Sequence, residues 1–272
     1  MRVVFSECRS DEARYLSPYQ VLAYLEAGER PSDAFAAGFL PRTPELGRFY
    51  LSRSVRVDLS RYGDDARTRR VQRKCHGIDA ELAPAAHFAF DDEWRALFRS
   101  YMAERRSAPP SVEAFASRLR AAGTTDVLVF VDRRAERRVG LATLYLEPEA
   151  ALWGTSIYAT AYLDRSIGRF MVAKVIETAR RAGCRFAYLG NVYRREHLYK
   201  CRFPGTEFFN GWSWSDDHAE LRFLLEHREV SGEEHLLDRE AYAAWGSVLA
   251  RSASDLRLHL TTGHRPHASC AD

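Results

Sequence analysis

The sequence has no long apolar run and no strong excess of charge of either sign. No stretch approaches the ~20 consecutive apolar residues that a membrane-spanning helix requires. Residues 1–17 carry charges where a secretion signal needs an apolar centre. These absences predict a cytoplasmic protein that makes no contact with a membrane. The net charge of +3 is too small to indicate nucleic-acid binding by itself, so any such inference needs a local cluster of basic residues.

Cysteine is also scarce and scattered. The five cysteines, which are Cys8, Cys75, Cys184, Cys201 and Cys270, form no CxxC pair and no Cys/His cluster with the spacing of a zinc site. His264, His267 and Cys270 lie close together near one end but lack a fourth ligand. We therefore expect no disulfide scaffold, no metal and no cofactor.

A length of 272 residues with 46% hydrophobic content suffices for two lobes with separate cores. The segment Ala83–Ala86 reads as a break because it contains proline among small residues. The pattern predicts a smaller N-terminal α+β lobe over residues 1–85 and a second domain over 86–225. A C-terminal helix over about 238–250 and a disordered tail are expected within 226–272.

In the N-terminal lobe, Pro18–Ala27 has helical spacing and stops at Gly28, whereas Arg48–Leu59 alternates like a half-buried strand. Two helices open the second domain, one capped by Asp91 and Asp92 and one beginning at Ser111. Three β-rich runs separated by charged turns follow and predict an antiparallel meander. These runs are 126–131, 139–146 and 152–162.

The next unit is a βαβ crossover. Arg165–Ala182 has the spacing of a helix closed by Gly183, and the apolar run Phe186–Leu189 follows at once. The strands before and after the helix should be parallel neighbours. Helices, meander and βαβ unit in this order resemble the GNAT fold, so we expect an α/β protein with a GNAT-like mixed sheet. Leu221–Leu225 is a further strand candidate.

A GNAT-like domain transfers acyl groups by holding an activated carbonyl between two splaying parallel strands, where backbone N–H groups stabilise the oxyanion. Enzymes of this fold that use coenzyme A carry R/Q-x-x-G-x-G/A at the following helix N-terminus, which cradles the pyrophosphate. Here Arg165–Phe170 matches only the first glycine, and Phe170 would crowd the phosphate. Coenzyme A is therefore disfavoured as the donor, but it stays an alternative.

Several blocks resemble the arginyltransferases and the bacterial aspartate/glutamate leucyltransferases of the N-degron pathway. The segments Tyr162–Phe170 and Ala182–Gly190 are similar to the family's "D…SLG(T)…LG.PY.YLG" core, and Tyr199–Pro204 is similar to "YKARFRP". In the N-terminal lobe, Phe49–Tyr50 and Val55–Lys74 resemble "FYRP…VPVRVDL.RF.PSRSQRRVLRK". Together the blocks cover most of residues 45–214 in the family's order.

Two departures from the family pattern are visible. The N-terminal CxxC-type cluster of the family is absent, because Leu51–Ser54 contains no cysteine. Where many members have "KMAYK", this chain has Glu196–Lys200, so the acceptor can differ from the usual acidic N-degron.

The resemblance implies an aminoacyltransferase that moves an amino acid from aminoacyl-tRNA to an amine on a protein or small molecule. Such a site must deprotonate an ammonium, hold an oxyanion and protonate the ribose hydroxyl. We predict Asp164 and Tyr199 as catalytic residues. Asp164 is as readily explained as a helix N-cap, and Tyr199 as a core tyrosine.

Further residues are predicted to bind substrate or tRNA. The predicted substrate-binding residues are Ser166, Gly168, Tyr188, Gly190, Lys200, Phe203 and Glu147, with Glu147 and Glu149 as rim carboxylates that are otherwise exposed turn residues. The predicted tRNA-binding residues are Arg67, Arg69, Arg70, Arg73, Lys74 and Arg202. The basic run is equally typical of a solvated helix face balanced by Asp64 and Asp65.

Three functions thus remain open from sequence: the tRNA-dependent aminoacyltransferase, a coenzyme A-dependent N-acyltransferase, and a GNAT-like module that binds a partner without catalysis. Neither the amino acid transferred nor the acceptor nor the oligomeric state follows from the sequence.

Overall fold

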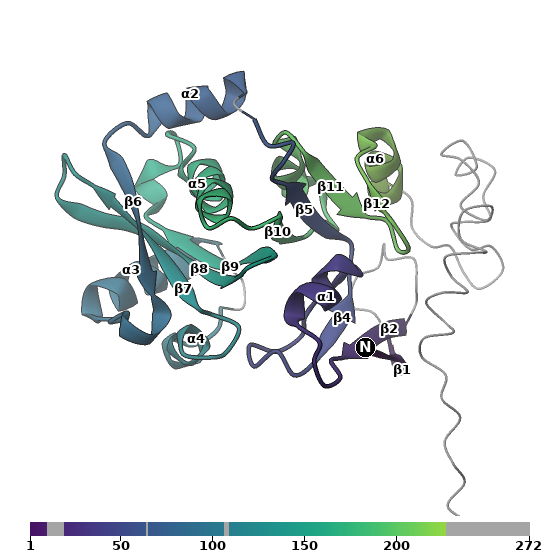
Figure 1. Cartoon of the computed structure of the whole chain (residues 1–272). Coiled ribbons are helices and arrows are strands. Elements are labelled where there is room, and N and C mark those ends of the chain that lie inside the picture. Colours follow the sequence, from purple (N-terminus) through teal and green to yellow (C-terminus); the bar gives the residue numbers. More distant parts are fainter. Residues whose placement is uncertain (10–18, 64, 106–108, 227–272) are drawn as a thin grey trace, which may run out of the picture.

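A computed structural model describes residues 1–9, 19–63, 65–105 and 109–226 of the chain (Figure 1). Two sheets share this part of the protein, one of four strands and one of eight. The predicted C-terminal helix and tail lie outside the described residues.

The smaller sheet has the strand order β1-β2-β4-β3 and carries helix α1 (Pro31–Ala36). Its strands are β1 (Arg2–Arg9), β2 (Tyr19–Tyr24), β3 (Phe39–Pro41) and β4 (Phe49–Leu51). The helix predicted over Pro18–Ala27 is wrong, because its core is strand β2. Leu22 pairs with Val4 on one side and with Tyr50 on the other, and these ladders satisfy the backbone better than a short isolated helix would.

The larger sheet has the order β12-β11-β5-β10-β9-β8-β7-β6. Its strands are β5 (Ser54–Asp58), β6 (Ile78–Pro84), β7 (Asp126–Asp132), β8 (Arg137–Glu147), β9 (Ala150–Tyr158), β10 (Phe186–Asn191), β11 (Thr206–Phe209) and β12 (Trp214–Ser215). The predicted meander is present as the antiparallel run β7-β8-β9, and β10 is parallel to β9. The α/β class with a GNAT-like mixed sheet is therefore confirmed.

The segment Arg48–Leu59 forms two strands rather than the predicted single one. Ser52 and Arg53 separate β4 from β5, and the two strands belong to different sheets. Because β5 and β6 both precede residue 85, the hydrogen bonds of the larger sheet cross the predicted lobe boundary. The division into 1–85, 86–225 and 226–272 itself stays a prediction.

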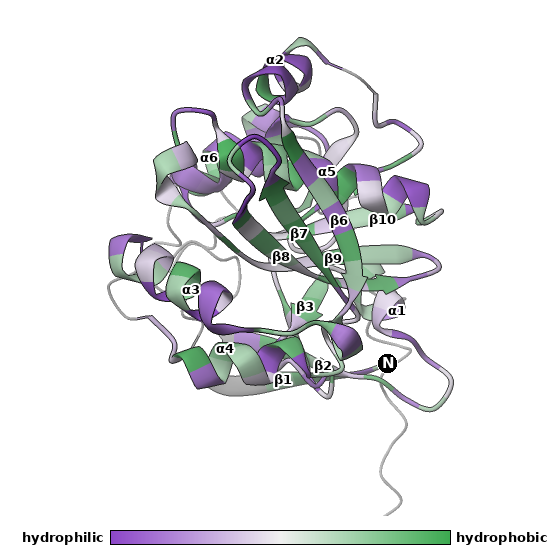
Figure 2. Ribbon diagram, turned by 90° about the vertical axis from the view of Figure 1, so that its left-hand side faces the viewer, coloured by the Kyte–Doolittle hydropathy of each residue, from purple (hydrophilic) through white to green (hydrophobic). Residues whose placement is uncertain are grey.

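Helices cover both faces of the larger sheet (Figure 1). The helices are α2 (Ala66–Lys74), α3 (Asp92–Arg105), α4 (Val112–Leu119), α5 (Ile167–Arg181) and α6 (His218–Glu226), with 3₁₀ turns η1 (Ala85–His87), η2 (Thr160–Tyr162) and η3 (Arg195–Arg202). Alternate residues of the meander pack on α3 and α4, and the others pack on α5. Figure 2 shows the apolar central strands β7 and β8 below the largely hydrophilic α2.

Side chains cap the helices α3, α4 and α6 at their N-termini. The two helices that open the second domain begin where the sequence indicated, since Asp91 accepts from the Trp94 N–H and Ser111 from the Ala114 N–H. The strand predicted over Leu221–Leu225 is wrong, because these residues belong to α6. Leu221, Leu224 and Leu225 are buried at helical spacing, and Asp217 accepts from the N–H groups of the first turn.

A buried carboxylate holds the turn between β9 and α5. Asp132, 5% exposed at the end of β7, accepts hydrogen bonds from the Tyr162 hydroxyl at 2.9 Å and from Arg165 Nη1 at 3.2 Å. Burial opposes ionisation of Asp132, but the bonds from Tyr162 and from backbone N–H groups outweigh it and lower its pKa. The charged carboxylate therefore stabilises the fold above the ordinary aspartate pKa, and this contribution is lost as the pH falls through the lowered value.

We expect Asp132→Asn to lower the free energy of unfolding at neutral pH by about 2–3 kcal/mol, because Arg165 loses its buried partner. Urea unfolding at several pH values measures this, and the difference from the unsubstituted protein should shrink in acid. Asp79→Asn is the matched control, because Asp79 pairs with Arg133 on the exposed surface and should cost under ~1 kcal/mol. Equal losses at the two positions would contradict the buttress role of Asp132.

Candidate active site

The parallel strands β9 and β10 separate partway along their length. They pair from Phe186 with Ala150 to Tyr188 with Leu152, and the pairing ends there although both strands continue. Past this point each strand has a bulge against its other neighbour. The register of β9 against β8 gains a residue between Trp153 and Ser156, and that of β10 against β5 gains one between Tyr188 and Asn191.

A glycine lies within each bulge. Gly190 has φ +78°, a conformation that strains residues with a Cβ. At Gly154 a Cβ would run into the Thr143 hydroxyl. Since bulges bend a strand and increase its twist, the paired bulges explain why β9 and β10 diverge at this level.

The opening between the strands is one part of a cavity of about 1220 Å³. Its walls include Leu152–Ser156 of β9 and Leu189–Asn191 of β10. The first turn of α5 contributes Ser166–Arg169, and η3 contributes Tyr199 and Lys200. The predicted cleft between diverging parallel strands is therefore present and open. Four of the residues predicted for the substrate, Ser166, Gly168, Gly190 and Lys200, line it together with Tyr199.

Positive charge dominates the cavity. Six cationic side chains line it, against the single carboxylate of Glu196; they are Arg42, Arg105, Arg118, Arg169, Arg194 and Lys200. Arg118 Nη1 lies 3.3 Å from the Thr155 hydroxyl in the β9 bulge, and the Arg42 guanidinium lies over the Tyr50 ring. Such a surface attracts anionic ligands.

Two neighbouring side chains of η3 have shifted pKa values. Burial raises the pKa of the Tyr199 hydroxyl to about 12, so this group is a proton donor at neutral pH. Burial lowers the pKa of the Lys200 ammonium to about 8, which brings its neutral form within physiological reach. Lys200 Nζ donates to the Asn191 carbonyl at 3.0 Å, at the end of β10.

A second cavity of about 700 Å³ adjoins the other side of η3. Its walls include Arg67, Arg202 and Arg222 as well as the apolar Phe203. Arg169 connects the two cavities, because it lines the first, donates to the Arg202 carbonyl at 3.2 Å and lies over the Phe203 ring. The predicted residues Phe203 and Arg202 thus lie at the second cavity rather than the first.

The predicted tRNA-binding run lies on helix α2, which packs on α5. All five of its basic side chains, Arg67, Arg69, Arg70, Arg73 and Lys74, are exposed. Arg67 lines the second cavity, and Lys74 Nζ donates to the Asp164 carbonyl at 3.0 Å beside the first turn of α5. The basic face of α2 is therefore continuous with the second cavity.

Three of the residues predicted for catalysis or substrate binding line neither cavity. Asp164 is exposed in the turn before α5, where its carboxylate accepts from the Arg165 N–H. It is not the N-cap either, because Ser166, with φ +63°, occupies that position. Glu147 is the last residue of β8 and pairs with the first residue of β9, at the end of that strand opposite the cavity and near Tyr145 and Cys184. Tyr188 is 1% exposed and packs on Phe35 and Trp214 between the two sheets, so it supports β10 from behind.

Other wall residues escaped the sequence reasoning because they come from distant segments. Asn191, Arg118 and Arg42 meet at the cavity from β10, α4 and the β3–β4 connection. Asn191 also donates to the Tyr50 hydroxyl at 3.3 Å, which joins the smaller sheet to the cavity wall. Only Arg169 had a usable signal, since it follows the glycine of the quoted Arg165–Phe170 segment.

The described residues contain neither a metal-binding cluster nor a membrane-spanning helix. Among them, no group of three or more histidines, cysteines, aspartates and glutamates is arranged to hold a metal ion. No helix in the described part of the chain combines the length and apolar character needed to cross a bilayer.

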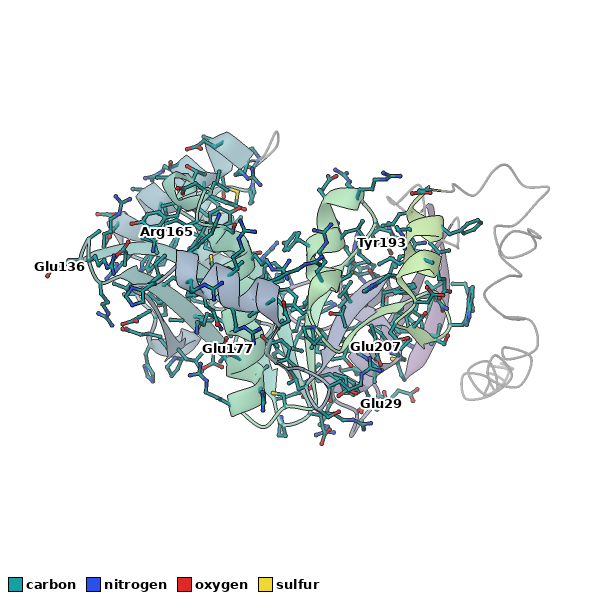
Figure 3. The ribbon with its side chains drawn as sticks, turned by 90° about the horizontal axis from the view of Figure 1, so that it is seen from above. Glu29, Glu136, Arg165, Glu177, Tyr193 and Glu207 are labelled. Carbon is teal, nitrogen blue, oxygen red and sulfur yellow. The ribbon has the colours of Figure 1, made fainter. Side chains whose placement is uncertain are left out.

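Figure 3 views the molecule from above, with Arg165 on the α5 side and Tyr193 and Glu207 on the β11 side.

The element order, the diverging strands and the cavity at their separation define a GNAT-like acyltransferase domain. No family model matches the sequence. The aspartate/glutamate leucyltransferase of Marinobacter nauticus is 32% identical over 168 residues, which are 60% of this chain and 69% of that protein. The enzyme of the same name from Ruegeria sp. is 30% identical over 182 residues, 61% of this chain and 64% of its own length.

The chain belongs to the aspartate/glutamate leucyltransferase family. It is thus an enzyme of the aminoacyltransferase class, which confirms that prediction, whereas these relatives do not support the arginyltransferase part of the resemblance. Among solved structures, L-PGS from Bacillus licheniformis aligns with a TM-score of 0.42 at 13% identity, over 64% of this chain and 55% of that one. That likeness is too slight to carry a functional conclusion.

Proposed function

We propose that this enzyme transfers an aminoacyl group, leucine as in the names of its relatives, from the 3′ end of a tRNA to the amine of a protein acceptor. The reaction takes place in the cavity between β9 and β10. The observation that carries the proposal is the coincidence of three features at one point: the end of β9–β10 pairing, the paired bulges and a strongly cationic wall.

The cationic tract supports a nucleic acid as the donor. It runs from the exposed face of α2 through Arg67 and Arg202 at the second cavity to Arg169 and into the first cavity. Phosphate contacts by arginine and lysine position a nucleic acid without reading its sequence. Contacts with this tract place the phosphates of the tRNA acceptor end near the first cavity, where the aminoacyl ester reacts.

The first turn of α5 offers less to a pyrophosphate than a coenzyme A site requires. The N–H groups of Ser166, Arg169 and Phe170 already donate to backbone carbonyls. Phe170 is 2% exposed, packs on Phe130 in the core and does not line the cavity, so the crowding of a phosphate predicted from its bulk is not seen. The engaged N–H groups favour aminoacyl-tRNA over coenzyme A as the donor.

The chemistry requires an oxyanion site and a proton donor for the ribose. Strands that stop pairing at the cavity leave backbone groups available to a tetrahedral intermediate. Tyr199, protonated at neutral pH, is our candidate donor to the departing ribose oxygen, which deepens the role predicted from sequence. The relatives are named for aspartate and glutamate, and Arg42 and Arg118 suit an acidic residue at the acceptor's N-terminus.

The direct test combines the full chain with radiolabelled leucyl-tRNA and a polypeptide that begins with aspartate. We expect label in the polypeptide, lost on ribonuclease treatment and lost when the polypeptide's N-terminus is acetylated. Acetyl-coenzyme A is supplied in a parallel reaction. Acetylation of the acceptor without RNA, together with no transfer from the charged tRNA, would contradict the proposal.

The basic face of α2 makes a second prediction. We expect Arg70→Gln combined with Arg73→Gln to raise KM for the charged tRNA about tenfold with kcat little changed, because the two lost phosphate contacts affect binding alone. The plot of log affinity against log salt should become shallower by about 1.4–1.8, at ~0.7–0.9 for each of the two contacts. Initial rates at several tRNA concentrations measure KM and kcat. Filter binding over a range of salt concentrations measures the salt slope.

The matched control is Arg180→Gln combined with Arg181→Gln. These two arginines lie in the last turn of α5, at the opposite end of that helix from the cavity, and remove the same charge. Their loss should leave KM and the salt slope unchanged. If both double variants weaken tRNA binding equally, the effect reflects net charge and the contact with α2 is not supported.

A further inference from the structure

Lys200 lies at the place where β9 and β10 part. Its Nζ is 3.0 Å from the carbonyl of Asn191, the last residue of β10, and 5.4 Å from the centre of the Trp153 ring on β9. A Cβ on Gly190 would lie 3.6 Å from Nζ, in ordinary van der Waals contact, so the amine lies directly beside the bulge of β10. The lysine amine thus reaches the gap between the strands from the η3 side and lies on the cavity wall.

The surroundings of Lys200 are unusual for a lysine. Within the described residues no carboxylate forms a salt bridge with Lys200, and its Nζ donates a hydrogen bond to a neutral carbonyl. The charged and titratable side chains that share the cavity are the arginines 42, 105, 118, 169 and 194, the tyrosines 50, 101, 158 and 199, and Glu196 and His197. Burial disfavours the ammonium form of Lys200 and lowers its pKa to about 8.

We propose that Lys200 is the general base of the transfer reaction: its neutral amine removes the proton from the acceptor's ammonium group where β9 and β10 diverge. The inference rests on the proposed function. It gives the removal of the acceptor's proton to Lys200 instead of Asp164, which the sequence predicted as a catalytic residue. The hydrogen bond to the Asn191 carbonyl also holds Lys200 Nζ against β10, one of the two strands that form the cleft. The base and the carbonyl site are therefore positioned by the same strand.

The step balances as follows. The acceptor ammonium gives one proton to Lys200, and the resulting amine attacks the ester carbonyl to form the C–N bond. The C–O bond to the ribose then breaks, and the ribose oxygen takes a proton from Tyr199, which regains one from the attacking nitrogen. Lys200 releases its proton to solvent, so the net reaction yields an amide, a free ribose hydroxyl and one proton.

The test compares Lys200→Met and Lys200→Arg in the full chain, with charged tRNA and a peptide acceptor at saturating concentrations. Both variants should lose about 100-fold or more in single-turnover rate, because neither side chain can accept a proton near neutral pH. The rate of the unsubstituted enzyme should rise with pH through about 8, and this rise should disappear in Lys200→Met. Affinity for the charged tRNA should be retained by Lys200→Arg.

A low-pKa nucleophile separates proton removal from positioning. Methoxyamine is already unprotonated at neutral pH, so the defect of Lys200→Met should be much smaller with methoxyamine than with the peptide. Lys174→Met, at a lysine of α5 that pairs with Glu177, controls for the loss of a lysine elsewhere and should keep full activity.

The outcomes are distinct. Near-normal transfer by Lys200→Arg would show that only the charge matters and would overturn the general-base role. So would an equal defect with methoxyamine and peptide, or an unchanged pH profile. Failure of the unsubstituted protein to transfer from any aminoacyl-tRNA would instead overturn the proposed function on which the inference rests.

Discussion

Gly168→Trp is expected to lower kcat/KM for transfer by about 100-fold or more while the protein stays folded, since displacing the reacting groups by about 1 Å can cost that much. Gly168 is the second residue of α5 and lines the cavity. A Cβ there would meet the Tyr158 ring at 3.5 Å, which is an ordinary contact, so the backbone tolerates a side chain. The indole would then occupy the space that we assign to the aminoacyl end of the tRNA.

Gly168→Ala is the matched control. Alanine fits the same contact and improves helix propensity by up to ~1 kcal/mol, so stability should be equal or higher and activity close to normal. Thermal unfolding and initial rates of both variants measure this. An active and folded Gly168→Trp would show that the substrate does not use this part of the cavity.

Gly38→Ala is expected to lower the free energy of unfolding by about 3 kcal/mol, combining a left-handed backbone penalty of ~1–2 kcal/mol with an overpacking cost of similar size. Gly38 has φ +87°, and a Cβ on it would overlap the ring of Phe209 on β11. Gly38 therefore marks where the smaller sheet closes on the larger one. Both sheets supply walls of the cavity, so KM should rise as well.

Gly28→Ala separates the two causes. Gly28 has nearly the same φ, +88°, but a Cβ there meets nothing within 4 Å. Its substitution should cost only the backbone penalty, about 1 kcal/mol. Equal losses in urea unfolding of the two variants would contradict close packing of Phe209 on Gly38.

The elements that the sequence predicted well are those with strong periodicity and local caps. The helix predicted over Arg165–Ala182 is α5 at Ile167–Arg181, and the run Phe186–Leu189 is β10 at Phe186–Asn191. The GNAT-like order follows from these elements and the meander before them. Local sequence also determined α3 and α4, because Asp91 and Ser111 cap them through their own side chains.

The errors arose where tertiary pairing outweighs local preference. The apolar spacing of Pro18–Ala27 suits a helix, but β1 and β4 supply hydrogen-bonding edges on both sides of Tyr19–Tyr24. In the segment Leu221–Leu225 the short apolar run was ambiguous, and the capping carboxylate of Asp217 lies upstream of the window that suggested a strand. Neither ladder nor cap is visible from the hydrophobic pattern alone.

The site was predicted in part. Tyr199, Lys200, Gly168 and Gly190 do line one cavity, because β10, the start of α5 after β9 and the η3 turn after β10 meet there. Asp164 does not, since a 3₁₀ turn and an N-cap at Ser166 turn it toward solvent. The arginine wall combines residues from the β3–β4 connection, from α3, α4 and α5, and from the segment after β10, and no local pattern specifies such an assembly. The glycines of the two bulges were the available clue to the separation of β9 from β10.

The most direct measurement is a crystal structure of the full chain with an adenosine whose 3′-amino group carries leucine in amide linkage, a stable mimic of the aminoacyl-tRNA end. We predict that the amide carbonyl lies between Leu152–Trp153 of β9 and Leu189–Asn191 of β10, with the adenosine toward Arg169. An adenosine bound elsewhere on the protein, with its leucyl carbonyl outside the gap between these strands, would contradict the account.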